Sequence, residues 1–264
     1  MHSKFFGILG KTDYFNFNLN RIPLHEVLDK YLQPTGWLAT ITHYQQVIPP
    51  DKQTIFESGA WGYREQENPT IRGKTVTAEF TLEEYKKRAP KPGDLILAPD
   101  HLLLNSSNIK SRVQFNDRSS QTFLPLALKV LPKCTPAAVV HGESVKEKVQ
   151  RAQELYAQGY RAIAVGGLVP LSNYKSLVFE TVKAIRTSLP TDCYCHILGL
   201  SSPPFAQFWS QLSIDSFDGS SYIQNALKTG SRQANLAWFS QKPHTVTVRV
   251  GAGMDSGRLL TGDG

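Results

Sequence analysis

The sequence predicts an α/β protein built as a closed (β/α)8 barrel, the TIM-barrel architecture. Three observations lead to this prediction. About eight short apolar runs recur along the 264 residues, and helical patterns separate the runs of the second half. The length is also close to the roughly 250 residues that such barrels use as one domain. We therefore expect a single domain over residues 1–264, in which residues 250–264 form a loose tail.

The candidate strands are short, and several are apolar without alternation, as is typical of strands buried on both faces. In chain order they are Leu38 to Thr42, Thr54 to Phe56, Leu95 to Ala98, Ala137 to Val140, Ala162 to Val165, Cys193 to Leu198, Ile214 to Phe217 and Thr245 to Val250. Between the second and third runs, Glu65 to Thr77 interrupts the pattern. We expect an excursion from the barrel there, such as a hairpin.

Helical patterns lie between the later strands. Val145 to Gln158 places apolar residues at spacings of three and four, and Ser144 and Gly159 suit its two ends. Tyr174 to Leu189 repeats this pattern, and Pro203 to Leu212 begins with prolines that suit a first helical turn. Alternating strands and helices predict right-handed βαβ units and a parallel sheet.

Composition narrows the class of protein. Hydrophobic residues make up 41% and charged residues 19%, which excludes a disordered chain, collagen and a coiled coil. No apolar stretch approaches the roughly 18 residues of a membrane span, so we expect a soluble, cytoplasmic protein. The formal charge of +7 fits a polyanionic partner such as a nucleic acid. Simple solubility would explain the same surplus.

Acidic residues follow three of the predicted strands. Glu57, Asp100 and Asp218 would meet at one rim, because active sites of such barrels lie at the carboxyl ends of the strands. Paired carboxylates suit chemistry at an anomeric carbon, where one acts as nucleophile and another transfers protons. A third can accept hydrogen bonds from the N–H groups of a purine. Alternatively, each acid caps the helix that follows it.

Other rim residues suit ligand binding. Gly166 and Gly167 would let a ligand approach bare backbone, although a tight turn explains them equally well. His141 could contact a base or shuttle a proton, or it could be a hydrogen-bonded structural residue.

The three cysteines are an odd number and form no disulfide framework. Cys193 and Cys195 would point to one face of a strand, but a tetrahedral zinc site needs further ligands. We interpret them as buried strand cysteines and predict no metal site and no cofactor.

The segment from Val139-Val140-His141-Gly142-Glu143-Ser144 to Ala164-Val165-Gly166-Gly167-Leu168 resembles the guanine transglycosylases. These enzymes exchange guanine for a 7-deazaguanine in tRNA, or in DNA for one branch. His196-Ile197-Leu198-Gly199-Leu200 and Ile214-Asp215-Ser216-Phe217-Asp218-Gly219 are similar to the family's next two strands, and the second is closest to the archaeal-type sequence. The resemblance covers roughly Ala137 to Leu227 and, more thinly, Phe56 to Asp100. It implies a (β/α)8 barrel, in agreement with the strand count.

The resemblance also implies catalytic roles. Asp218 would be the nucleophile that attacks C1′ of the target nucleotide and forms a covalent glycosyl–enzyme intermediate while guanine leaves. Glu57-Ser58-Gly59-Ala60-Trp61 corresponds to the family's Asp-Ser-Gly-Gly-Phe or Asp-Ser-Gly-Ala-Phe element. The acid of that element, here Glu57, is the proton-transfer group.

The remaining roles concern the base. Asp100 matches the aspartate that recognises it. Gly166, Gly167 and Leu168 match the backbone segment that contacts its carbonyl or its substituent. Leu198 stands where an apolar residue packs on the base.

The chain departs from the family at several points. Glu57 replaces Asp, and His141 stands where the tRNA enzymes usually carry Gln. The zinc-binding Cys-x-Cys-x-x-Cys segment expected after the nucleophile is missing, so we expect a divergent, short member without the zinc module. Lys228 and Arg232 are candidates for phosphate contacts.

The expected partners are a nucleic acid, either DNA or tRNA, and a 7-deazaguanine base. A homodimer or further subunits are possible partners as well. Two other functions stay open. The chain could be a non-catalytic relative that binds a base or a nucleic acid as a subunit, or another barrel enzyme that acts on small glycosides.

Overall fold

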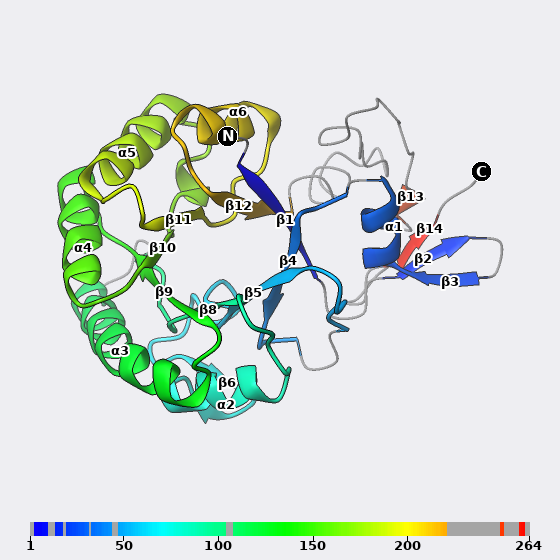
Figure 1. Cartoon of the computed structure of the whole chain (residues 1–264), viewed down its shortest axis with the longest axis horizontal. Coiled ribbons are helices and arrows are strands. Elements are labelled where there is room, and N and C mark those ends of the chain that lie inside the picture. Colours follow the sequence, from blue (N-terminus) through cyan, green and yellow to red (C-terminus); the bar gives the residue numbers. More distant parts are fainter. Residues whose placement is uncertain are drawn as a thin grey trace.

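The computed structural model describes residues 3–9, 14–17, 20–31, 33–43, 47–103, 108–220, 249–250 and 259–261. Within them, eight parallel strands close into a barrel in the order β1-β12-β11-β10-β9-β8-β5-β4, and helices line its outside (Figure 1). The predicted (β/α)8 barrel is confirmed. The strands are β1 (Lys4–Ile8), β4 (Gly36–Thr40), β5 (Gln53–Glu57), β8 (Leu95–Leu97), β9 (Thr135–Val140), β10 (Ala162–Val165), β11 (Tyr194–Ile197) and β12 (Ser216–Gly219).

One strand prediction was wrong. The sequence predicts a barrel strand at Thr245 to Val250, but the eighth barrel strand is β1, which pairs with β12 on one side and β4 on the other. Of the predicted run, only β13 (Arg249–Val250) is a described strand, and it pairs antiparallel with β14 (Leu259–Thr261) outside the barrel. Lys4–Ile8 is a short run near the start of the chain, so its sequence pattern alone does not identify it as a barrel strand. It becomes one by pairing with β12 and β4, which closes the barrel.

A second sheet lies beside the barrel and contains β2 (Tyr14–Phe17), β3 (Asn20–Pro23), β13 and β14. Most of residues 250–264, the predicted tail, lies outside the described residues. Lys228 and Arg232, the two predicted phosphate contacts, lie outside them as well.

The three predicted helices are confirmed as α4 (Val145–Ala157), α5 (Lys175–Ser188) and α6 (Pro203–Gln211). The Ser144 side chain accepts a hydrogen bond from the backbone N–H of Glu147, and the Glu147 side chain completes a capping box. Gly159 follows α4 with a φ of +112°, a conformation that favours glycine.

The first half of the chain holds three helices that the periodicity did not reveal, α1 (Leu24–Tyr31), α2 (Ala78–Lys86) and α3 (Ile109–Val130). In the second half, the 3-10 turn η1 (Val169–Leu171) was not predicted either. The predicted excursion at residues 65–77 does contain a hairpin, formed by β6 (Thr70–Ile71) and β7 (Lys74–Thr75).

The core has two layers. Between the strands and the helices lies the larger apolar layer, and a smaller one fills the barrel interior with side chains such as Phe6, Ala164 and Val139. In the strand register, Phe6 lies beside Asp218, and Ala164 lies beside His196. Because side chains alternate along a strand, Asp218 and His196 therefore project into the barrel, on the same layer as this inner core.

Two further findings concern the described residues. None of their helices combines the length and the apolar character needed to cross a membrane. They also contain no group of three or more His, Cys, Asp or Glu side chains placed to hold a metal ion.

The three cysteines are buried, and burial raises the pKa of Cys193 to about 11 and that of Cys195 to about 12. Both thiols are protonated at neutral pH, which agrees with their interpretation as core residues.

Candidate active site

The predicted site residues gather at the carboxyl end of the barrel. Each lies at the end of a strand or within three residues after one. Glu57 ends β5, Asp100 follows β8, His141 follows β9, Gly166 follows β10, Leu198 follows β11, and Asp218 is the next-to-last residue of β12. The closed ring of strands brings them to one mouth, as the position of active sites in such barrels predicts.

Asp218 is buried and accepts two hydrogen bonds at one oxygen. His196 Nε2 lies 3.0 Å from Asp218 Oδ1, and the backbone N–H of Gly199 donates to the same oxygen over 3.1 Å. Gly199 has a φ of +80°, and an added Cβ would lie 2.6 Å from Val169 Cγ2, so this turn requires glycine. The turn after β11 thus delivers a backbone donor to the carboxylate of β12.

Asp100 is paired in the same way with a second histidine. His141 Nε2 lies 2.7 Å from Asp100 Oδ2, and both side chains are largely buried. The Tyr63 hydroxyl donates to the backbone carbonyl of Asp100 over 2.7 Å and lies 2.7 Å from Ser58 Oγ. The element that follows Glu57 therefore fixes the loop that carries Asp100.

Glu57 differs from the two aspartates. It is partly exposed, and no hydrogen bond to its carboxyl group occurs among the described residues. Burial, followed by the negative charges of Asp218 and Asp100, raises its pKa from 4.5 to about 8. The electrostatic effect of both aspartates on Glu57 shows that the three acids share one site. A carboxyl group with a pKa near neutrality is suited to both donating and accepting a proton.

The backbone after β10 closes against His141. A Cβ added to Gly166 would lie 2.7 Å from His141 Cε1, so only glycine lets the imidazole keep its place. Gly167 has a φ of +69°. The Leu168 side chain is buried in the outer apolar layer, which leaves only its backbone for a ligand, whereas Leu198 packs against the inner layer.

These residues stand in the order in which the guanine transglycosylase resemblance places them. A DNA-guanine transglycosylase from Salmonella montevideo is 29% identical to this chain over 191 residues. The chain is therefore similar to a protein of the guanine transglycosylase type. The match covers 69% of the chain and 44% of the Salmonella protein, so the chain spans less than half of the length of that relative. No protein-family model matches the sequence.

The structure adds residues to the site that the sequence motifs did not single out. His196 contacts Asp218, and behind it His196 Nδ1 lies 2.7 Å from Ser216 Oγ, which lies 2.8 Å from the Tyr194 hydroxyl. A signal for them exists in the sequence. Residues 194 and 196, like 216 and 218, are two apart on a strand and share one face. The sequence interpretation of this strand concerned its two cysteines and assigned no role to His196 or Tyr194.

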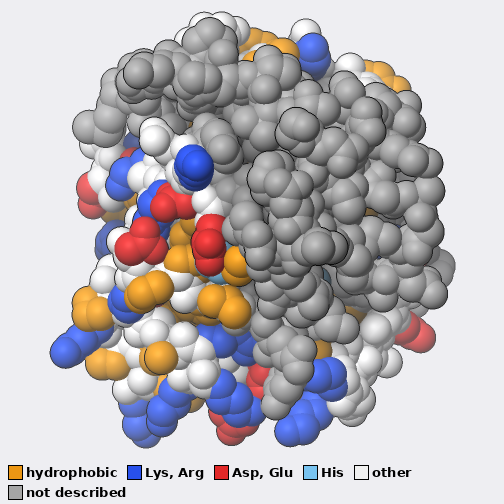
Figure 2. Space-filling model, turned by 90° about the vertical axis from the view of Figure 1, so that its right-hand side faces the viewer, with side chains coloured by type: hydrophobic (Ala, Val, Ile, Leu, Met, Phe, Trp, Pro, Cys, Tyr) orange, Lys and Arg blue, Asp and Glu red, His pale blue; other side chains and the backbone are white. Residues whose placement is uncertain are grey.

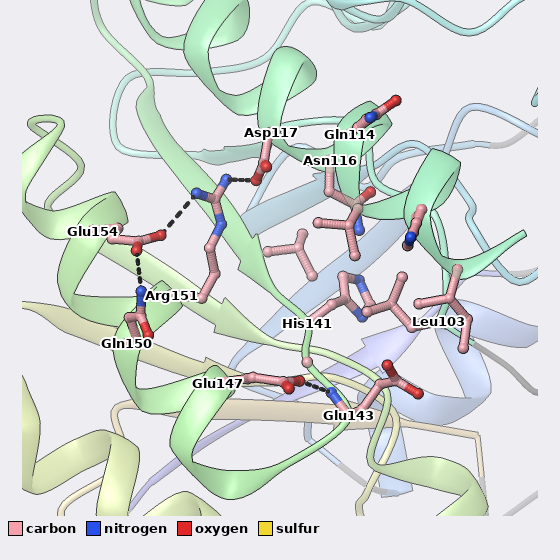
Figure 3. A pocket seen from close by; sticks show the side chains of 15 residues that line it. Leu103, Gln114, Asn116, Asp117, His141, Glu143, Glu147, Gln150, Arg151 and Glu154 are labelled. Carbon is pink, nitrogen blue, oxygen red and sulfur yellow. Dashed lines mark hydrogen bonds and ion pairs between the residues drawn. The ribbon is translucent and has the colours of Figure 1, made fainter.

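A groove of about 490 Å³ opens beside the mouth, between α3 and α4, and His141 lines its inner end (Figure 3). Arg151 is held there between Asp117, at 3.0 Å, and Glu154, at 3.4 Å. Glu143 also lines the groove. Lys110 also lines the groove, but the acidic lining residues outnumber the two basic ones, so the groove does not suit a phosphate chain.

The described outer surface carries basic, acidic and hydrophobic side chains side by side. On the face shown in Figure 2, the described Lys and Arg side chains are interspersed with acidic and hydrophobic ones. Trp61, in the loop after Glu57, is 54% exposed, and the Arg64 guanidinium lies over its ring at 4.6 Å. An exposed aromatic ring stacked with arginine is a surface on which unpaired bases can stack.

Proposed function

We propose that the protein exchanges guanine in a nucleic acid for a 7-deazaguanine derivative through a covalent intermediate on Asp218. The observation that carries this proposal is the mouth itself, where an aspartate held by two donors lies close to a carboxyl group whose pKa is about 8. A nucleophile and a proton-transfer group are the two parts that displacement at an anomeric carbon requires.

In the first step, an Asp218 carboxylate oxygen attacks C1′, and the C1′–N9 bond breaks. Its electron pair goes to guanine N9, and the protonated Glu57 supplies the proton that neutralises the leaving base. In the second step, the Glu57 carboxylate takes the N9 proton of the incoming base. That N9 then attacks C1′ and releases Asp218. Glu57 ends protonated, ready for another cycle, and the exchange needs no redox partner.

The base would be held by the second pair of side chains. With His141 on Oδ2 of Asp100, the other oxygen of Asp100 is available to accept hydrogen bonds from the amino and ring N–H groups of guanine. Because Gly166 and Gly167 have no side chains, the carbonyl edge or the substituent of the base can lie close to their backbone. The Leu198 side chain provides an apolar surface for the base to pack on.

DNA is the favoured polymer, because the relative that the chain matches is named a DNA-guanine transglycosylase. The net charge of +7 suits the phosphate backbone of either polymer. A duplex substrate would require the target nucleotide to be flipped into the barrel mouth.

The test is an exchange assay with guanine-labelled DNA and guanine-labelled tRNA, each with a 7-deazaguanine base. We expect release of labelled guanine, preferentially from DNA, and a denaturant-stable protein–DNA adduct when the incoming base is left out. The control is Asp218→Asn, which keeps the shape of the side chain and should form no adduct. Parent protein that releases no label from either polymer would refute the proposal.

A second candidate is a base-binding subunit without catalysis. The observation that favours it is Glu57, which stands where the family carries the shorter aspartate, since a displacement of about 1 Å can cost on the order of 100-fold in rate. This candidate predicts that labelled base binds at the mouth, that His141→Ala weakens the binding, and that no adduct depends on Asp218.

A further inference from the structure

A chain of four side chains crosses the barrel interior from Tyr194 to Asp218. The Tyr194 hydroxyl lies 2.8 Å from Ser216 Oγ, Ser216 Oγ lies 2.7 Å from His196 Nδ1, and His196 Nε2 lies 3.0 Å from Asp218 Oδ1. All of these residues belong to β11 and β12. His196 and Ser216 are almost inaccessible to solvent. The two strands and the burial of His196, Ser216 and Asp218 give these side chains a fixed geometry.

Only one pattern of protons satisfies every member of this chain. Burial raises the pKa of Tyr194 to about 12, so its hydroxyl is protonated, and among the described residues Ser216 Oγ is the acceptor within reach. Since Tyr194 donates to Ser216, the Ser216 hydroxyl is free to donate to His196 Nδ1. The proton of the neutral imidazole then stands on Nε2 and points at Asp218. With a proton on Nδ1 instead, Tyr194 and His196 would both donate to Ser216 Oγ, and neither would be left to accept the Ser216 proton.

The two oxygens of Asp218 are therefore unequal. Oδ1 accepts from His196 Nε2 and from the Gly199 N–H, whereas Oδ2 has no hydrogen-bond partner among the described residues. An oxygen that already accepts two hydrogen bonds has its lone pairs directed at the donors, so the other oxygen is the stronger nucleophile.

We propose that His196 is a positioning residue which, fixed as the Nε2–H tautomer by Ser216 and Tyr194, holds Asp218 Oδ1 together with the Gly199 N–H and leaves Oδ2 as the oxygen that attacks C1′. This inference rests on the proposed function of Asp218 as the nucleophile. It adds which oxygen reacts, what orients it, and why β11 carries a histidine between two buried cysteines.

A histidine that only filled space would behave differently from one that positions the carboxylate. Glutamine and asparagine separate the two roles, because the glutamine amide reaches the place of Nε2, whereas the shorter asparagine amide reaches only that of Nδ1. His196→Gln keeps a donor to Asp218, and His196→Asn keeps only the contact with Ser216. Both variants are polar and similar in size, so a space-filling role predicts equal effects.

The experiment measures the rate of adduct formation and the KM for the base in His196→Gln and His196→Asn. His25→Asn serves as the control, because His25 lies on α1 outside the barrel. We expect His196→Asn to lower the rate by roughly 100-fold with the KM for the base unchanged. His196→Gln should stay within about tenfold of the parent, and the control should equal it. Equal rates in the two His196 variants, whether fast or slow, would overturn the inference.

A second measurement does not depend on exchange activity. In ¹⁵N-histidine-labelled protein at pH 7.5, the nitrogen chemical shifts should show His196 as the neutral Nε2–H tautomer. In Ser216→Ala, which removes the donor to Nδ1, that tautomer should lose its predominance. An Nδ1–H tautomer or an imidazolium in the parent protein would overturn the inference even if exchange proceeds. Parent protein that shows the Nε2–H tautomer but exchanges no base would support the positioning geometry and refute only the proposed function.

Discussion

Replacement of Glu57 by glutamine should change how the stability of the protein depends on pH. The carboxyl pKa is 4.5 ordinarily and about 8 in the folded protein, because of burial and the charges of Asp218 and Asp100. Between these values the folded state keeps a proton that the unfolded state has released. The folded protein therefore loses stability as the pH rises from about 4.5 to about 8, and the loss is complete above that range.

The magnitude follows from the displacement of the pKa. Each pH unit corresponds to about 1.4 kcal/mol, so the full effect has an upper limit of about 5 kcal/mol at pH 9. Because Glu57 is partly exposed at the barrel mouth, solvent screens its charge, and we expect roughly 2–3 kcal/mol. Glutamine has the same shape and does not titrate, so Glu57→Gln should lack this loss.

The assay is urea unfolding of the parent protein and Glu57→Gln at intervals from pH 5 to pH 9. We expect the free energy of unfolding of the parent, measured relative to the variant, to fall across this range. Asp218→Asn is the informative control, because removal of one negative charge should move the fall to lower pH. Parallel curves for parent and Glu57→Gln would refute the assignment of a raised pKa and, with it, the role of Glu57 as a proton donor near neutral pH.

Three further predictions concern other parts of the structure. Gly166→Ala should weaken binding of the base by roughly tenfold, measured by calorimetry, because the added Cβ would lie 2.7 Å from His141 Cε1 and displace the imidazole. An unchanged affinity would show that His141 does not take part in recognising the base. Ser144→Ala should lower the free energy of unfolding by about 1 kcal/mol, because it removes the capping box of α4, and it should leave exchange intact. A chelator such as EDTA should leave the exchange rate unchanged, since the displacement proposed for Asp218 and Glu57 uses only side chains and the two bases.

The second half of the barrel was predictable because its signals are local. The capping box at Ser144, the glycine at 159 and the apolar spacing of α4 all act within one helix, and each matches the structure. The first half of the barrel was less predictable, because its structure depends on contacts between distant parts of the chain. Helix α3 runs from Ile109 to Val130 with Pro125 inside it, and its burial depends on tertiary contacts such as that of the Tyr160 hydroxyl with the backbone carbonyl of Ser120. β1 becomes a barrel strand only through partners that are distant in the sequence.

In the candidate site, too, some features could be predicted from the sequence and others could not. The three acids and His141 were predictable, since each follows an apolar run and the fold itself places strand ends together. The pairing of each aspartate with a histidine was not, because the partners are 41 and 22 residues apart and no sequence pattern states which rim residues touch. The raised pKa of Glu57 is likewise a property of the assembled mouth, since two of its causes are charges on other strands.

The three acids of the mouth thus differ in their hydrogen-bond partners, and these partners, rather than the residue type, set the role proposed for each acid. Asp218 and Asp100 each have a histidine on one oxygen, whereas the Glu57 carboxyl has no donor among the described residues and faces both of their charges. Two carboxylates with donors and one protonated acid form a lower-energy arrangement than three unpartnered charges. The same charges that hold the proton on Glu57 come from the groups proposed to attack the sugar and to bind the base. Neutralising Asp218 by bonding it to C1′ therefore lowers the pKa of Glu57, which favours release of its proton at the moment when the leaving guanine requires one.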